Sequence, residues 1–182
     1  HLIELIAHHE KICPHLHIPL QSGDTEVLSK MRRNYNAKQY EHIVRRASEK
    51  ISPLGLGADV IVGFPGESEV SFEHTRKLIE ELPFSYLHVF SYSPRSGTEA
   101  HNFKNNIKNI TKKERNLILN DLVKEKAQQF YKSFIGKKVT VLVEERKQAD
   151  GVLKGHSEHY IPVSIDAEGL LQNQLVSVLI TE

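Results

Sequence analysis

The nine residues DVIVGFPGE, at positions 59–67, decide how the rest of the chain is interpreted. The β-branched apolar run that ends at Val62 is typical of a buried strand in a parallel sheet. Gly63 and Gly66 then allow backbone conformations that a side chain would block. Glu67 and Glu69 are acidic where a helix N-terminus favours negative charge, and an apolar helix face follows. The stretch therefore predicts a strand, a glycine turn and the start of a helix.

Two further strand-like runs flank this stretch. Residues 15–20 end in QSG at positions 21–23, and residues 86–90 end in SYSPR at positions 91–95. Helical patterns separate the three runs, which predicts parallel strands joined by right-handed crossovers. Three strands are few for a closed barrel or a complete sheet, so we expect an α/β fold that forms part of one.

The second half of the chain changes its hydrophobic period. Residues 111–114 have capping-box spacing and predict the start of a long helix that stops near Gly136. Short strands separated by polar or glycine turns follow, which is typical of a small β-barrel or OB-like module. We therefore divide the chain into residues 1–110, a linking helix at 111–135 and a small β domain at 136–182.

Bulk properties narrow the class of protein. The chain has no apolar run of the roughly 18 residues that a membrane span needs, and no signal peptide is visible. Its single cysteine, Cys13, excludes an internal disulfide and favours a reducing, cytoplasmic location. Residues 103–138 carry ten Lys and Arg against three acidic residues. This basic segment suits phosphate contacts, although on charge alone a solvated lysine-rich helix face is the favoured explanation.

The three strand ends predict a binding site. The carboxyl ends of parallel strands meet at one edge of a sheet, so QSG, GFPGE and YSPR should converge. Gln21 and Ser22 offer neutral hydrogen bonds that suit ribose or amide groups, and glycine-turn backbone suits an adenine edge. Arg33 and Arg95 are suited to bind a carboxylate or phosphate through two hydrogen bonds. We expect a nucleoside or amino-acid ligand there.

The spacing of the histidines along the sequence does not indicate a metal site. His15 and His17 alternate on one strand, and His8 and His9 are adjacent on a helix. Neither pair has helical i, i+4 spacing or a neighbouring carboxylate or thiolate in the sequence.

Taken together, these motifs resemble the radical S-adenosylmethionine methylthiotransferases. The matching strings are HIPLQSG at 17–23, the run through MRR at 31–33, DVIVGFPGE at 59–67 and FSYSPRSGT at 90–98. The tail from Gly136 to Ile180 resembles the RNA-binding TRAM module of that family. The resemblance implies half of a radical SAM βα barrel with parallel strands, followed by a small all-β TRAM or OB-like barrel.

The resemblance also implies which residues contact S-adenosylmethionine. Gln21 and Ser22 would lie near its ribose, and residues 63–67 would line its adenine side. Four more residues would border the cofactor or substrate cavity. The expected cofactor-binding set is Gln21, Ser22, Arg33, Asp59, Gly63, Phe64, Pro65, Gly66, Glu67, Tyr92 and Arg95. No catalytic residue is assigned.

The implied parent enzyme inserts a methylthio group at C2 of an N6-modified adenosine beside the tRNA anticodon. LHVF at 87–90 and MRR at 31–33 look most like the branch that acts on threonylcarbamoyladenosine. The expected partners are tRNA, through its anticodon stem-loop, S-adenosylmethionine and the missing amino-terminal half of the polypeptide. The alternatives are a ribosomal-protein methylthiotransferase of the same family and a non-catalytic RNA-binding protein with a decayed barrel.

The cluster ligands of that family are absent from this sequence. The family binds iron–sulfur clusters through a C-x3-C-x2-C motif and an amino-terminal domain, and Cys13 alone replaces neither. We therefore expect the clusters only in the full-length parent, and this chain alone to be inactive.

Overall fold

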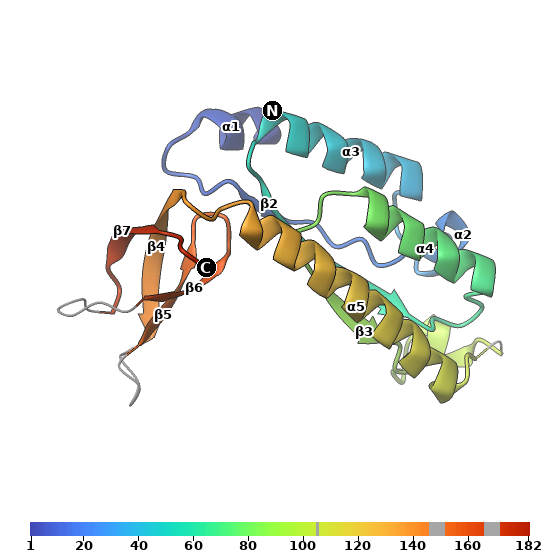
Figure 1. Cartoon of the computed structure of the whole chain (residues 1–182). Helices are drawn as coiled ribbons and strands as arrows, with labels where there is room; N and C mark the ends of the chain where they lie inside the picture. Colours follow the sequence, from blue (N-terminus) through green and yellow to red (C-terminus); the bar gives the residue numbers. More distant parts are fainter. Residues whose placement is uncertain (105, 146–151, 166–171) are drawn as a thin grey trace. The chain divides into compact units, whose positions relative to one another are not determined.

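The computed structural model describes residues 1–104, 106–145, 152–165 and 172–182 (Figure 1). The chain forms two compact units. The first contains residues 1–16, 50–55 and 128–182, and the second contains residues 17–49 and 56–127. This grouping cuts across the expected divisions after residues 110 and 135, because two amino-terminal pieces are grouped with the carboxyl-terminal strands. The domain boundaries therefore stay a prediction.

A three-stranded sheet carries the candidate site. Its strands are β1 (His15–His17), β2 (Gly55–Val62) and β3 (Tyr86–Ser91), in the order β1-β2-β3. β2 and β3 are parallel, with Asp59 opposite His88. Since side chains alternate along a strand, the fully buried Val60 and Val62 face the core while Asp59 faces the other side. The prediction of an α/β fold with parallel strands is confirmed.

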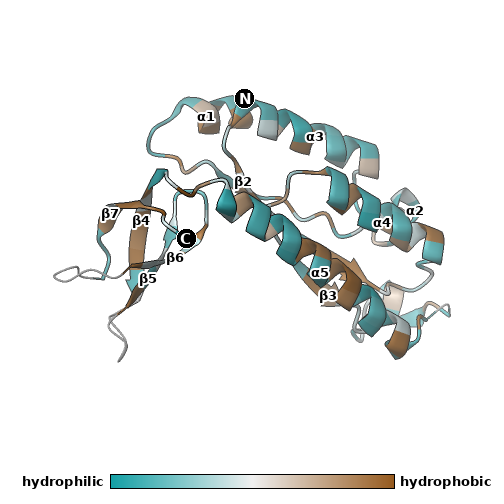
Figure 2. Ribbon diagram, in the orientation of Figure 1, coloured by the Kyte–Doolittle hydropathy of each residue, from teal (hydrophilic) through white to brown (hydrophobic). Residues whose placement is uncertain are grey.

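Helices of the same unit contribute buried residues beside this sheet: α2 spans Thr25–Lys30, α3 Ala37–Lys50 and α4 Glu69–Glu81. α1, Leu2–His8, belongs to the first unit. Val44 and Ala47 of α3 and Ile79 of α4 are completely buried. Figure 2 shows hydrophobic residues concentrated in the strands and hydrophilic residues interspersed along the helices.

Polar side chains fix where these helices begin. The Asp24 carboxylate accepts hydrogen bonds from the Glu26 and Val27 N–H groups, both at 3.0 Å, before α2. The Asn36 side chain accepts from the Gln39 N–H, and the Gln39 side chain accepts from the Asn36 N–H, each at 2.9 Å. Such reciprocal bonds satisfy N–H groups that have no partner in the first turn. Asp24 and Asn36 therefore cap α2 and α3.

The long helix begins earlier than the sequence predicted. A short 3₁₀ helix, η1 (Glu99–Asn102), precedes α5, which spans Asn109–Lys132. Thr111 is therefore inside the helix, and the predicted capping box at 111–114 is wrong; the Lys112 N–H already donates to the Lys108 carbonyl at 3.1 Å. Among the described residues, no helix is long and apolar enough to cross a membrane.

The carboxyl-terminal strands form a second, antiparallel sheet. They are β4 (Lys138–Glu145), β5 (Leu153–Ser157), β6 (Pro162–Ile165) and β7 (Leu175–Leu179), in the order β6-β5-β4-β7. Phe134, Val141 and Leu153 belong to its buried core. The pairings among the described residues leave β6 and β7 at the edges of the sheet. Closure into a TRAM or OB-like barrel stays a prediction.

Candidate functional site

A pocket of about 820 Å³ lies at the carboxyl end of the parallel strands. This volume is within the range of small-molecule and cofactor sites. Its wall brings together six of the eleven residues in the expected cofactor-binding set: Gln21, Arg33, Asp59, Phe64, Tyr92 and Arg95. They come from all three strand ends and from the segment after α2, so the expected convergence of these segments is present in the fold.

The backbone of Gln21 is held in a strained conformation. Its φ is 65°, in the left-handed region that residues other than glycine rarely adopt. Its N–H donates to the Asp59 carbonyl at 2.8 Å, and its carbonyl accepts from the Ile61 N–H at 2.9 Å. These two bonds fix Gln21 against β2 at the pocket wall. Strained residues that the surrounding structure over-determines cluster at functional sites.

The glycine turn is built around a buried carboxylate. Gly63 and Gly66 have φ of 73° and 83°, which require glycine. The Glu67 side chain, with 1% exposure, accepts the Gly63 N–H at 2.7 Å. Glu67 thus points back into the turn, and of residues 63–67 only Phe64 reaches the pocket wall.

Ser22 also points away from the pocket. It is completely buried, lies 3.3 Å from the Thr75 hydroxyl and accepts the Asp24 N–H at 3.2 Å. Its hydroxyl therefore joins the QSG turn to α4 and α2. Ser22, Gly63, Pro65, Gly66 and Glu67 shape the loops behind the pocket wall.

Two basic residues of α5 complete the turn. Arg115 donates to the Glu67 carboxylate at 2.6 Å and to the Glu67 carbonyl at 3.1 Å, and it also pairs with Glu69 at 3.0 Å. Lys112 donates to the Tyr92 carbonyl at 3.1 Å. A Cβ on Gly63 would lie 2.4 Å from Lys112 Cγ, so only glycine lets this side chain pass.

Lys112 and Arg115 were counted in the basic segment and not as part of the site. Both are buried, together with Leu119 and Val123 of the same helix. The spacing 112, 115, 119, 123 is the i, i+3, i+7 pattern of one helix face, which was the available sign that these two cations face inward. They are therefore removed from any RNA-facing surface.

Burial raises the pKa of the Glu67 carboxyl, while the Gly63 N–H and the Arg115 guanidinium act in the opposite direction. Within the part of the chain described, Glu67 Oε1, Arg115 Nε and the Tyr92 hydroxyl are buried without a hydrogen-bond partner. Of these three, only Tyr92 belongs to a residue that lines the pocket; Glu67 Oε1 and Arg115 Nε belong to the ion pair behind the pocket wall.

The pocket combines positive charge with aromatic surface. Arg33 and Arg95 are exposed and form no ion pair among the described residues, whereas Arg32 is paired with Glu99. The Phe64 and Tyr92 rings pack edge to face, with their centroids 5.2 Å apart. Guanidinium groups bind carboxylates and phosphates, and aromatic edges suit a planar base. With the Gln21 amide and the Asp59 carboxylate, this donor set fits a nucleoside that carries an anionic group.

The residues do not fit an iron–sulfur cluster. The only cysteine of the sequence, Cys13, is exposed. Such clusters are held by several thiolates. This sequence therefore does not supply the thiolate ligands of such a cluster.

Known proteins with similar sequences cover the whole chain. The sequence profile of the radical SAM superfamily matches residues 1–79. The tRNA-2-methylthio-N(6)-dimethylallyladenosine synthase of Geobacillus kaustophilus is 42% identical over 182 residues, which are 100% of this chain and 34% of that protein. The threonylcarbamoyladenosine tRNA methylthiotransferase MtaB of Aquifex aeolicus is 40% identical over 180 residues, 98% of this chain and 42% of that protein. The chain thus spans well under half the length of these relatives.

Proposed function

We propose that this chain, which is similar to radical SAM proteins and to tRNA methylthiotransferases, belongs to the radical S-adenosylmethionine methylthiotransferase family and forms the cofactor and substrate pocket of a tRNA-modifying enzyme. The observation that carries the proposal is the convergence of six residues on one pocket: Gln21, Arg33, Asp59, Phe64, Tyr92 and Arg95. S-adenosylmethionine combines an adenine, a ribose and an amino-acid carboxylate. Each has a matching group in this wall.

The residues of this chain act by binding and orienting. Gln21 offers its amide to ribose hydroxyls, and Phe64 lies where a planar base has an aromatic edge to contact. Arg33 or Arg95 would bind the carboxylate. When a cluster from the rest of the parent protein is present, the cofactor supplies the radical chemistry. This chain alone is expected to be inactive in that reaction.

The proposed substrate is an adenosine modified at N6, next to the tRNA anticodon. The names of the relatives include both a dimethylallyl and a threonylcarbamoyl substituent. A threonylcarbamoyl group carries a carboxylate, whereas a dimethylallyl group is apolar. Arg33 and Arg95, which have no ion pair within the described part of the chain, favour the anionic substituent. We therefore propose threonylcarbamoyladenosine as the substrate.

The carboxyl-terminal sheet and the basic segment are proposed as the tRNA contact. Lys113, Lys132 and Lys138 are exposed and supply phosphate-binding charge. Lys126 contributes less, because its ammonium donates to the Glu80 carbonyl at 2.8 Å and burial lowers its pKa. Electrostatic binding of this kind is sequence-independent and sensitive to salt.

Binding of anticodon stem-loops to the 182-residue chain tests substrate and partner together. The loops carry unmodified, threonylcarbamoyl or dimethylallyl adenosine and are compared across a salt series. We expect the threonylcarbamoyl loop to bind most tightly, and the affinity for all three to fall with salt. Arg95→Ala should remove the preference, while Arg46→Ala, an exposed arginine outside the pocket, should keep it.

Two results would contradict these assignments. A dimethylallyl preference that Arg95→Ala leaves unchanged would overturn the choice of substrate. Absence of binding at low salt would favour the ribosomal-protein branch of the family. In that case the nucleoside pocket remains to be tested by the cofactor itself.

A further inference from the structure

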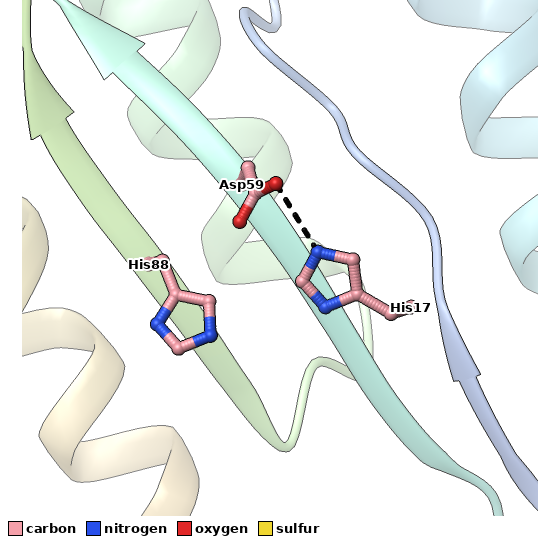
Figure 3. A group of neighbouring side chains, drawn as sticks. All are labelled: His17, Asp59 and His88. Carbon is pink, nitrogen blue, oxygen red and sulfur yellow. Dashed lines mark ion pairs between the residues drawn. The ribbon is translucent and has the colours of Figure 1, made fainter.

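Three potential metal ligands lie together on the open face of the parallel sheet. His17 comes from β1, Asp59 from β2 and His88 from β3, so each strand contributes one residue (Figure 3). Asp59 and His88 are direct partners in the register of β2 and β3. One ligand atom from each residue lies within 4.8 Å of the other two. The sheet thus assembles a cluster that residue spacing along the chain could not reveal.

The donor set is that of a transition-metal site. Two imidazole nitrogens and one carboxylate oxygen bind Zn²⁺ in metalloenzymes and Fe²⁺ in oxygenases. His17 Nε2 and Asp59 Oδ2 are 3.2 Å apart. With metal–ligand bonds of about 2.0–2.1 Å, tetrahedral ligands are roughly 3.3 Å apart. This pair therefore already has the separation of two ligands on one ion, and His88 closes the site by a small rotation of its exposed ring.

A second partner orients His17 for this role. Its Nδ1 lies 3.1 Å from the Tyr86 hydroxyl, so the other ring nitrogen, Nε2, is the one that faces Asp59. Metal-binding histidines almost always form such a bond through the nitrogen that does not touch the metal. The Tyr86 ring also meets the His88 ring edge to face, at 5.5 Å, and limits where that imidazole lies.

We propose that His17, Asp59 and His88 bind one divalent first-row transition-metal ion, with Zn²⁺ as the representative. The three side chains leave at least one coordination position for water or another ligand. His17 and Asp59 have side-chain exposures of 31% and 30%, so the ion has access from solvent. Asp59 also lines the pocket, which places the ion at the pocket's edge. The proposal rests on this geometry and not on the proposed substrate.

Metal titration of the metal-stripped 182-residue chain tests the site. Zn²⁺ is titrated in competition with a chromophoric chelator, and Co²⁺ is used to record the visible absorption of low-symmetry coordination. We expect one Zn²⁺ ion to bind tightly to each chain. His88→Ala and Asp59→Asn should each weaken it at least ~10-fold, and Tyr86→Phe, which keeps the ring but removes the hydroxyl, by about 10–100-fold.

The chain has eleven histidines, so a control must separate this cluster from the others. His42→Ala removes an exposed histidine of α3 and should change neither affinity nor the Co²⁺ spectrum. Circular dichroism of each metal-free variant verifies that it is folded. Equal tight binding by the wild type, His88→Ala and Asp59→Asn would place the ion elsewhere and overturn the proposal. So would binding only at large metal excess, which would leave His17 and Asp59 as a simple ion pair.

Discussion

Glu67 and Arg115 form an ion pair that is almost completely removed from water, with side-chain exposures of 1% and 6%. Glu67 accepts the turn's Gly63 N–H, so the pair connects α5 to the loop behind the pocket. Removing one residue of a buried ion pair lowers the stability of the fold, because the charge that remains has lost both its hydration and its partner. The pair therefore positions the glycine turn.

Replacing Arg115 with methionine should lower the free energy of unfolding by about 3–5 kcal/mol. The side chain keeps its bulk, and the loss is the uncompensated Glu67 carboxylate. Urea denaturation measures the change. Lys113→Met, at an exposed position of the same helix, should stay within about 0.5 kcal/mol of the wild type. Equal effects of the two substitutions would show that the pair does not hold the turn.

The cost of Arg115→Met should depend on pH in a defined direction. Burial raises the pKa of folded Glu67 above its ordinary value of 4.5, and loss of Arg115 removes an influence that lowers it. The folded variant then holds a proton at a pH where the unfolded chain does not. Its stability is therefore greatest at low pH and is lost as pH rises through the folded pKa. Urea midpoints should show a smaller penalty at pH 5 than at pH 8; a constant penalty would contradict this account.

At the scale of single residues, six of the residues that line the pocket could be predicted from the sequence, but the Glu67–Arg115 ion pair behind the pocket wall could not. Motif residues at strand ends could be placed because parallel strands end on one edge of a sheet. Arg115 could not be paired with Glu67, since 48 residues separate them and only the fold brings them together. The cluster of His88 with His17 and Asp59 was not predicted for the same reason, because the three residues lie on different strands.

Among the elements, the strands and helix caps could be predicted because their causes are local. Asp24 and Asn36 precede helices and bond the next turn's N–H groups, which is a property of a few consecutive residues. The start of α5 was misplaced because Asn109 and Ile110 carry no strong local preference against helix, so the helix extends beyond Thr111. A helix boundary without a side-chain cap is therefore hard to place from the sequence.

The carboxyl-terminal sheet contains an element-scale pH dependence. His159 is buried beside the Phe134 ring, at 4.8 Å, and burial lowers its pKa from 6.5, although Glu158 and the backbone at Pro14 and Pro53 act to raise it. As the pH falls below 6.5, His159 therefore becomes protonated in the unfolded chain before it does so in the folded chain. Stability contributed by the neutral ring is therefore full above pH 6.5 and declines as pH falls below it.

Hydrogen exchange of the β4 amides measures this effect where it occurs. Protection of residues 139–143 should fall between pH 7.5 and pH 5.5, after correction for intrinsic exchange rates. His159→Phe, which keeps a ring against Phe134 and cannot titrate, should lose less protection over the same range. His9→Gln, at an exposed position, should behave like the wild type. If His159→Phe retains the full pH dependence, another group is responsible.

For the whole molecule, the resemblance noted from four short motifs agrees with similarity over the entire chain. Physical reasoning from the residues predicted a nucleoside site at the strand ends, and the resemblance to the family predicted S-adenosylmethionine as its ligand; both stay predictions. The sequence motifs favoured threonylcarbamoyladenosine, but the comparisons do not choose between the two modified adenosines, because relatives with either name are about equally similar. The choice of substrate therefore stays a prediction.

The most direct test of the central claim is a nuclear magnetic resonance titration of this chain with S-adenosylhomocysteine, which has the adenine, ribose and carboxylate of the cofactor. The account predicts saturable shifts of the Gln21, Asp59, Phe64 and Arg95 signals. Gln21→Ala should weaken the binding, and the exposed-site control Arg46→Ala should not. Millimolar binding is detectable this way, so the missing cluster does not hide the result. Absence of saturable shifts, or shifts confined to the carboxyl-terminal strands, would contradict the assignment of this pocket.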